Sequence, residues 1–92
     1  APALTLQLLP EPRRIAMDAG RERDHLLPRR YRDRDGWHAL LTTAGPDRLS
    51  GGSWEEDPYA REYFRCLSEE GVLLWIYRDG RRGEWFLHGW WD

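Results

Sequence analysis

The chain has no lysine: all fourteen of its basic residues are arginine. Its one cysteine, Cys66, excludes an internal disulfide framework and leaves no cysteine pair to hold a metal. A reducing cytosol is therefore the expected compartment. No apolar run approaches the ~20 residues of a membrane-spanning helix, so we expect no membrane contact. The sequence begins at Ala1 without an initiator methionine or a basic region, and we expect a fragment of a larger protein without a signal peptide.

The sequence also lacks a clear excess of either positive or negative charge. The formal net charge is -2 although 33% of the residues are charged, which gives no global electrostatic case for nucleic-acid binding. Coding bias explains the exclusive use of arginine, and arginine also suits planar, bidentate contacts at interfaces. A chain of 92 residues allows one domain with a modest core.

Aromatic residues are what the sequence has in abundance. Eight of the twelve fall in three alternating runs over residues 62–67, 72–78 and 84–92, which glycine-bearing turns separate. Such alternation of aromatic and β-branched residues predicts an antiparallel meander. So much ring surface on so short a sheet has to be buried, and we expect another protein to cover part of it.

The composition divides the chain into an entry segment and one domain. Two prolines exclude a helix from residues 1–13, which we expect to form an extended entry segment. Residues 14–92 are expected to form a single small β domain. Within it, residues 44–58 are rich in Gly, Ser, Pro and Asp and predict one long central loop that carries Trp54.

Three further strands are predicted between the entry segment and this loop. The Asp35-Gly36 pair favours a tight hairpin turn because it accommodates positive φ angles. Pro28 lacks a backbone donor, so its strand is expected at an edge or a bulge. Together the strands predict a mainly β fold, a small curved antiparallel sheet or open barrel of five to six strands. The three strands are expected over residues 14–18, 25–31 and 37–43.

No motif of catalytic or metal chemistry stands out. The three histidines lack metal-ligand spacing, and His88 is expected to be a hydrogen-bonded structural residue. Cys66 is expected to act as a small hydrophobe rather than a nucleophile. The acidic run over residues 55–57 is expected to be solvated. We therefore expect no enzyme, metal or cofactor, since a small-molecule or enzymatic domain would need a polar pocket around His88 or Cys66.

Two features are typical of a binding surface. Aromatic and arginine residues interleave in the last three runs, which suits a protein interface or a stacking platform for single-stranded DNA. The segment Gln7-Leu8-Leu9-Pro10 is loosely similar to short peptides that dock into a sliding clamp, and an edge strand explains it equally well.

A partner has two ways to bind such a surface. It can pair with a sheet edge, either residues 4–9 or the final strand, or it can insert apolar side chains into an aromatic face. We favour the aromatic face, because Trp90 and Trp91 project to opposite faces of one strand and cannot easily both be internal. The candidate partner-binding residues are Leu6, Leu8, Trp54, Tyr63, Trp75, Arg78, Trp85, Trp90 and Trp91.

Four blocks of sequence, which together span nearly the whole chain, stand out by their order and spacing. They are Leu8-Leu9-Pro10-Glu11-Pro12-Arg13, Ala44-Gly45-Pro46-Asp47-Arg48-Leu49 with Trp54 shortly after, Arg61-Glu62-Tyr63-Phe64, and Trp75-Ile76-Tyr77-Arg78 followed by Trp85-Phe86-Leu87-His88-Gly89. With these blocks the chain resembles the C-terminal domain of ImuB proteins, which are catalytically inactive Y-family DNA polymerase homologues of bacterial mutagenesis cassettes. The chain departs from the family at Ser53-Trp54, where the family usually has a tryptophan pair, and at Trp90-Trp91, which replace a terminal Leu-Phe.

The resemblance implies a role rather than a reaction. ImuB-like proteins bring together the RecA-like protein ImuA, an error-prone DnaE-type DNA polymerase and the sliding clamp after DNA damage. The resemblance thus implies that this chain is a non-catalytic interaction module of translesion synthesis. Such a module would be cytoplasmic and would associate with the nucleoid during the damage response. The clamp would be bound through the full-length protein, and contact with DNA would be indirect. The alternative is a single-stranded DNA-binding β domain that uses arginine and aromatic side chains.

Overall fold

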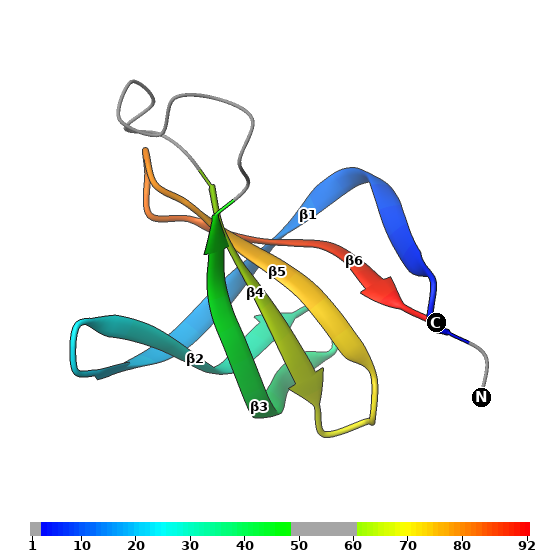
Figure 1. The fold of residues 1–92 in the computed structure, drawn as a ribbon, viewed down its shortest axis with the longest axis horizontal. Helices are drawn as coiled ribbons and strands as arrows, with labels where there is room; N and C mark the ends of the chain where they lie inside the picture. Colours follow the sequence, from blue (N-terminus) through cyan, green and yellow to red (C-terminus); the bar gives the residue numbers. More distant parts are fainter. Residues whose placement is uncertain (1–2, 49–60) are drawn as a thin grey trace.

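Six antiparallel strands form a closed barrel in the order β1-β2-β3-β4-β5-β6, and β6 pairs back onto β1 (Figure 1). The computed structural model describes residues 3–48 and 61–92. These residues contain no helix that could span a membrane. The predicted mainly β class is confirmed, and the barrel is closed rather than open. The strands are β1 (Leu6–Glu22), β2 (His25–Asp33), β3 (Gly36–Arg48), β4 (Arg61–Ser68), β5 (Leu73–Asp79) and β6 (Trp85–Trp91).

Strand β1 is much longer than the predicted strand at residues 14–18. It contains most of the expected entry segment, so the expected boundary between residues 13 and 14 lies inside a continuous strand. β1 pairs with β6 through Leu6–Leu8 and again through Arg13–Ile15. The two prolines lie between these pairings, where a missing backbone donor costs least. Figure 1 shows this part of β1 arching away from the barrel before it returns.

The predicted turn signals in the N-terminal half are found in the structure. β2 ends at Asp33 and β3 begins at Gly36, whose φ of 113° only glycine adopts easily. Pro28 pairs with Ala19 at a register shift between β1 and β2, so of the two predicted settings, an edge or a bulge, the structure has the bulge. β3 continues through the first residues of the predicted central loop. The rest of that loop, with Trp54, lies outside the described residues.

Inward-facing side chains of all six strands fill the barrel. Phe64 is 1% exposed and Cys66 is fully buried. Burying one large apolar side chain contributes roughly 1.5–3 kcal/mol, so this core accounts for much of the stability of so small a fold. The buried core consists of Ile15, Tyr31, Leu40, Phe64, Cys66, Leu74, Ile76 and Trp85.

A β-bulge in β6 reverses the in-and-out alternation of that strand. Trp75 pairs with Gly89, whereas the next residue of β5, Ile76, pairs with Leu87. His88 is therefore the extra residue, without a partner on β5. A one-residue bulge shifts every later side chain to the opposite face of the sheet.

The bulge decides the positions of the two C-terminal tryptophans. Trp90 lies opposite Leu74 and packs against the core, while Trp91 contacts Trp75 on the outer face. The prediction that the pair projects to opposite faces is confirmed.

Gly89 marks a very close approach of β6 to β1. It is buried and pairs with Leu8, and a Cβ at this position would collide with the carbonyl oxygen of Gln7. Since the obstacle is backbone, a larger residue requires a shift of one strand. The absence of a side chain at Gly89 thus permits the closure of the barrel.

We expect Gly89→Ala to lower the free energy of unfolding by about 1–3 kcal/mol, the range for overpacking a well-packed site. The matched control is Gly20→Ala, which is expected to have a much smaller effect because the atoms nearest to the new Cβ belong to the flexible guanidinium of Arg29. Urea denaturation of both variants measures the difference. Equal midpoints for Gly89→Ala and the parent protein would show that β1 and β6 do not meet as closely as described.

Candidate functional site

The outer face of β4, β5 and β6 carries a second layer of rings. Tyr63 and Trp75 stack with centroids 4.1 Å apart, Trp75 and His88 at 5.0 Å, and Tyr77 and Phe86 at 5.0 Å. These rings point away from the core because they alternate with inward-facing residues of the same strands. We call this group the aromatic layer. It consists of Tyr63, Trp75, Tyr77, Phe86, His88 and Trp91.

Polar contacts hold the centre of the aromatic layer. The Tyr63 hydroxyl lies 2.8 Å from Nδ1 of His88 and accepts a hydrogen bond of 3.2 Å from Arg61 Nη1. The Arg61 guanidinium also lies 4.4 Å from the centroid of the Tyr77 ring. Burial, and then the positive charge of Arg61, lower the pKa of His88, so its imidazole is neutral at pH 7. His88 is the hydrogen-bonded structural histidine that we predicted.

The aromatic layer is buried at its centre and open at its border. Tyr63 is 1% exposed and Tyr77 4%, whereas Trp75, Phe86 and Trp91 are half-buried. Tyr63 was predicted to contact a partner, but its side chain supports its neighbours and has almost no surface to offer. The half-buried rings form the accessible part.

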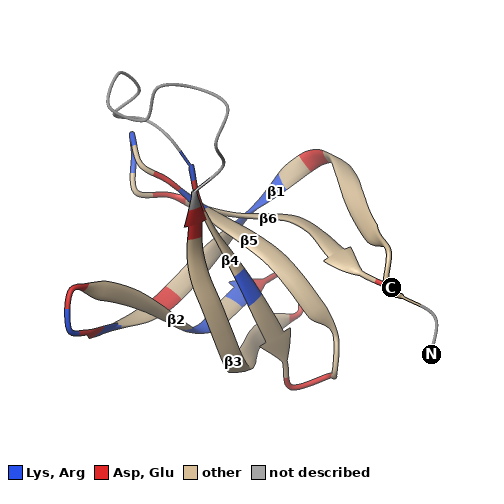
Figure 2. Cartoon of the chain, viewed as in Figure 1, with Lys and Arg blue, Asp and Glu red and all other residues tan. Residues whose placement is uncertain are grey.

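Leucines extend the accessible part of the layer along the sheet. Trp91 pairs with Leu6 of β1 and with Leu73 of β5, and Leu73 pairs with Leu67 of β4. Paired residues lie on the same face of a sheet. Leu8, two residues along β1 from Leu6, is 55% exposed. β6 itself carries no charged residue (Figure 2). The aromatic layer with Leu6, Leu8, Leu67 and Leu73 is called the outer apolar surface below.

The structure brings together five of the nine predicted partner-binding residues on the outer apolar surface. Trp85 is 9% exposed in the core and the partly buried Trp90 packs against it, so neither lies on the outer apolar surface. Arg78 forms an ion pair of 3.3 Å with Glu62. Trp54 lies outside the described residues. The five on the outer apolar surface are Leu6, Leu8, Trp75, Trp91 and the buried Tyr63.

Phe86 and Tyr77 belong to the interleaved aromatic runs that the sequence singled out, but they were not among the candidate partner-binding residues. Both residues alternate with core residues along their strands, and this alternation could have placed them on the outer face of the sheet. The bulge at His88, however, changes the phase within β6, and only the glycine that follows it hints at such an irregularity.

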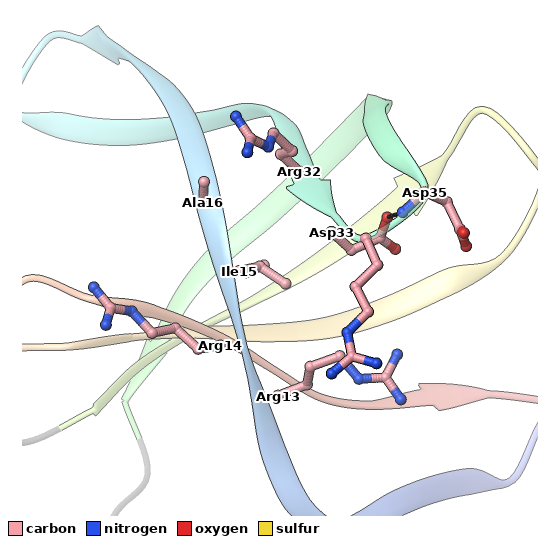
Figure 3. Close-up of a pocket in the computed structure, with 8 residues that line it drawn as sticks. Arg13, Arg14, Ile15, Ala16, Arg32, Asp33 and Asp35 are labelled. Carbon is pink, nitrogen blue, oxygen red and sulfur yellow. Dashed lines mark hydrogen bonds between the residues drawn. The ribbon is translucent and has the colours of Figure 1, made fainter.

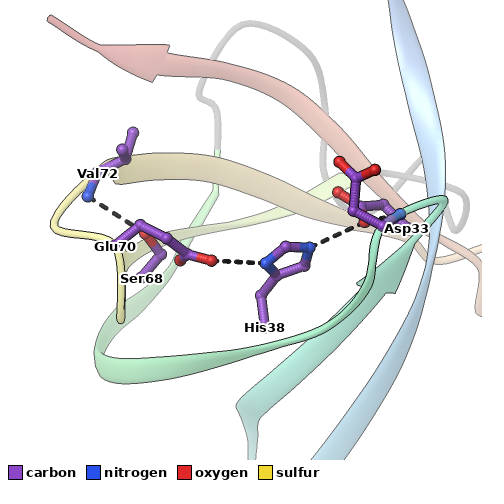
Figure 4. A network of polar contacts seen from close by, with 6 residues as sticks. Asp33, His38, Ser68, Glu70 and Val72 are labelled. Atoms are coloured by element: carbon purple, nitrogen blue, oxygen red, sulfur yellow. Dashed lines mark hydrogen bonds and ion pairs between the residues drawn. The ribbon is translucent and has the colours of Figure 1, made fainter.

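A second polar cluster, which the sequence did not predict, lies around His38 (Figure 4). His38 Nδ1 lies 2.7 Å from Glu70 Oε1, and Nε2 lies 2.8 Å from Asp33 Oδ1. Tyr31 stacks against the imidazole at 4.8 Å. The hydrogen bonds to Glu70 and Asp33 raise the pKa of His38. Although Glu69 also lies close, both imidazole nitrogens are engaged by carboxylates, so the cluster is better explained as an ionic network than as a metal site.

Cys66 is not a candidate nucleophile. Its side chain is fully buried, and burial raises the pKa of the thiol to about 11. The thiolate is the reactive form, so at neutral pH Cys66 is an inert part of the core. The prediction that it acts as a small hydrophobe is confirmed.

No protein-family model matches the chain, and no curated protein or solved structure is significantly similar to it. The fold and the surface therefore define the class: a small closed antiparallel barrel with apolar rings on both faces of one wall. Membership of the ImuB family stays a prediction.

His38 and His88 should titrate on opposite sides of the ordinary histidine pKa of 6.5. NMR titration is expected to place His38 above this value and His88 below it. Glu70→Gln should lower the pKa of His38, whereas Glu69→Gln, which removes a neighbouring charge but no hydrogen bond, should lower it less. Two histidines that titrate together near 6.5 would contradict both environments.

The same shifts set a pH window for stability. Because folding raises the pKa of His38, its contribution is present below pH 6.5 and is lost as pH rises through the raised value. Hydrogen bonds from His38 lower the pKa of Glu70. At Asp33, burial raises the pKa of the carboxyl, but the hydrogen bond from His38 and the other favourable contacts outweigh it and lower the pKa. The two carboxylates therefore stabilise the fold at pH values above their ordinary pKa values, and this stabilisation is lost as the pH falls through the lowered pKa values. The network should stabilise the fold most at mildly acidic pH.

Proposed function

We propose that this chain is a non-catalytic protein-interaction module, and that the outer apolar surface is its contact site. The observation that carries the proposal is the continuity of this surface, from exposed Leu8 and half-exposed Leu6 to Trp91 and Trp75. Contiguous apolar surface of this kind typically marks a binding site. Tryptophan is also enriched among the residues that contribute most to binding energy.

An apolar segment of another protein is the expected occupant. Its side chains would lie between the leucines of β1 and the half-buried rings of Trp75 and Trp91. A second mode adds backbone pairing, because within the described residues Leu6–Leu8 pairs with β6 on one side only. The final strand offers no such edge, since β6 lies between β1 and β5.

The particular role that we propose is that of an ImuB-like adaptor in translesion synthesis. The blocks that resemble the ImuB C-terminal domain, at residues 75–78 and 85–89, are the ones that supply most of the aromatic layer. In this proposal the module recruits ImuA, the error-prone DnaE-type polymerase, or both after DNA damage, and works in the cytoplasm at the nucleoid. The sliding clamp would be bound by other parts of the full-length protein.

Two observations count against an enzymatic role at the residues that the sequence offered for one. Cys66 is sealed in the core with a raised pKa. His88 is held by Tyr63 within the aromatic layer rather than at a polar pocket. We therefore propose a binding function without a cofactor.

Single-stranded DNA is a poorer match for the aromatic layer than a protein. Stacking platforms for bases need nearby cations for the phosphates. Here Arg65 is paired with Asp47 at 2.9 Å and Arg78 with Glu62 at 3.3 Å, so their charges are largely neutralised. Arg61 is committed to Tyr63 and Tyr77.

Leu8→Glu is expected to weaken binding to the protein partner by at least tenfold, because it would bury an unpaired charge in the interface. Leu8 is 55% exposed, so the free domain should keep its unfolding midpoint. Trp91→Ala should have a similar effect on binding with a modest loss of stability. Titration of the chain separately with purified ImuA and with the DnaE-type polymerase, followed by gel filtration, measures this.

Trp37→Ala is the matched control, since Trp37 is 45% exposed on the β2–β3 hairpin, away from the outer apolar surface. It should bind the protein partner like the parent chain. Normal binding by both Leu8→Glu and Trp91→Ala would refute the proposed surface. If the parent chain binds neither protein, the ImuB-like role is refuted.

A further inference from the structure

A groove of about 1000 Å³ opens between β1 and the β2–β3 turn (Figure 3). It is separate from the outer apolar surface, with which it shares no residue. Its charged lining is dominated by arginine and consists of Arg13, Arg14, Arg32, Arg34, Asp33 and Asp35.

The acidic residues of the groove do little to neutralise its arginines. Asp33 accepts hydrogen bonds from His38 and from the backbone N–H of Asp35. Arg14 is paired with Glu84 at 3.4 Å. The remaining three arginines have no hydrogen bond or ion pair with any described residue, although Arg13 lies near enough to Asp33 to help lower the pKa of that carboxyl. These three, Arg13, Arg32 and Arg34, are the uncommitted arginines of the groove.

An exposed tryptophan lies next to one arginine of the groove, Arg32, on the outer face of the hairpin. Trp37 pairs with Arg32 in the β2–β3 ladder, so both side chains lie on the same face. The guanidinium of Arg30 lies 4.6 Å from the centroid of the Trp37 ring, and a 2.8 Å ion pair with Asp18 anchors Arg30. The ring is thus supported by a fixed side chain while 45% of the residue stays exposed.

We infer that the groove and Trp37 form a binding site for single-stranded nucleic acid. Guanidinium groups bind phosphate oxygens in planar, bidentate geometry, which the uncommitted arginines provide. The aromatic ring beside Arg32 gives an unpaired base a surface on which to stack, and only a single strand presents such a base. An acidic peptide would satisfy the arginines but would leave Trp37 without a role.

The inference does not depend on the proposed protein interaction, because the two sites share no residue. It also explains how a chain with a net charge of -2 can bind a polyanion: the positive charge is local. Long-range attraction is weak in such a chain, so we expect a Kd on the order of 10 µM at low salt, within the usual range of non-specific binding.

Fluorescence anisotropy with labelled oligothymidylate and oligouridylate of about 15 nucleotides tests the inference on the full chain. Binding to one or both should weaken with salt, with a log–log slope of about -2 for three arginine contacts to a single strand. Arg32→Gln and Arg34→Gln should each weaken binding roughly fivefold and reduce the slope by about 0.7. Trp37→Ala should weaken binding about tenfold without changing the slope, because stacking contributes no charge.

Two controls separate this site from general attraction and from the outer apolar surface. Arg23→Gln removes an exposed arginine from the β1–β2 turn, at the other end of β2, and should leave binding unchanged. Trp91→Ala should also leave it unchanged.

The inference is overturned if neither oligonucleotide binds at low salt, or if Arg23→Gln weakens binding as much as Arg34→Gln. It is also overturned if polyglutamate binds as tightly as the oligonucleotides and Trp37→Ala has no effect, which would make the groove an acidic-peptide site. All variants keep the core intact, and circular dichroism should show an unchanged fold.

Discussion

The pairing of β1 with β6 is the contact on which the rest of this structure depends. It is possible because Gly89 lets the carbonyl of Gln7 lie directly against β6, where any side chain would stand in the way. The pairing closes the barrel and covers what would otherwise be an exposed, aromatic edge strand, which is prone to aggregation. It also lays Leu6 beside Trp91 and thereby joins the two ends of the chain into one surface.

A barrel of six strands is too narrow to enclose most of twelve aromatic side chains. Phe64, Trp85 and Tyr31 fill the interior, and a second group stacks on the outside of the same wall. The bulge at His88 determines which of the two C-terminal tryptophans faces the interior and which faces outward. The inner face of this sheet packs into the core, while its outer face leaves apolar surface accessible to a partner. This arrangement is the physical basis of the proposed interaction module.

Charge is distributed unevenly between the two surfaces. Near the aromatic layer, Arg65 and Arg78 are neutralised by carboxylates, so that surface favours apolar contacts. In the groove, Arg32 and Arg34 have no ion pair with any described residue, and Arg32 lies beside the exposed Trp37. Together the two proposals describe a small adaptor that holds a protein with one face and a single strand with another.

The sequence by itself determined the strand content, the Asp-Gly hairpin, the bulge at Pro28 and the structural roles of Cys66 and His88. Each of these follows from local preferences or from alternation along one strand. Only the tertiary structure decided that the barrel closes, that Trp90 faces inward while Trp91 faces outward, and that His38 binds two carboxylates. These features depend on register between strands that are far apart in sequence. A shift of one residue in this register moves a whole set of side chains to the other face of the sheet. No local sequence pattern predicts such a shift.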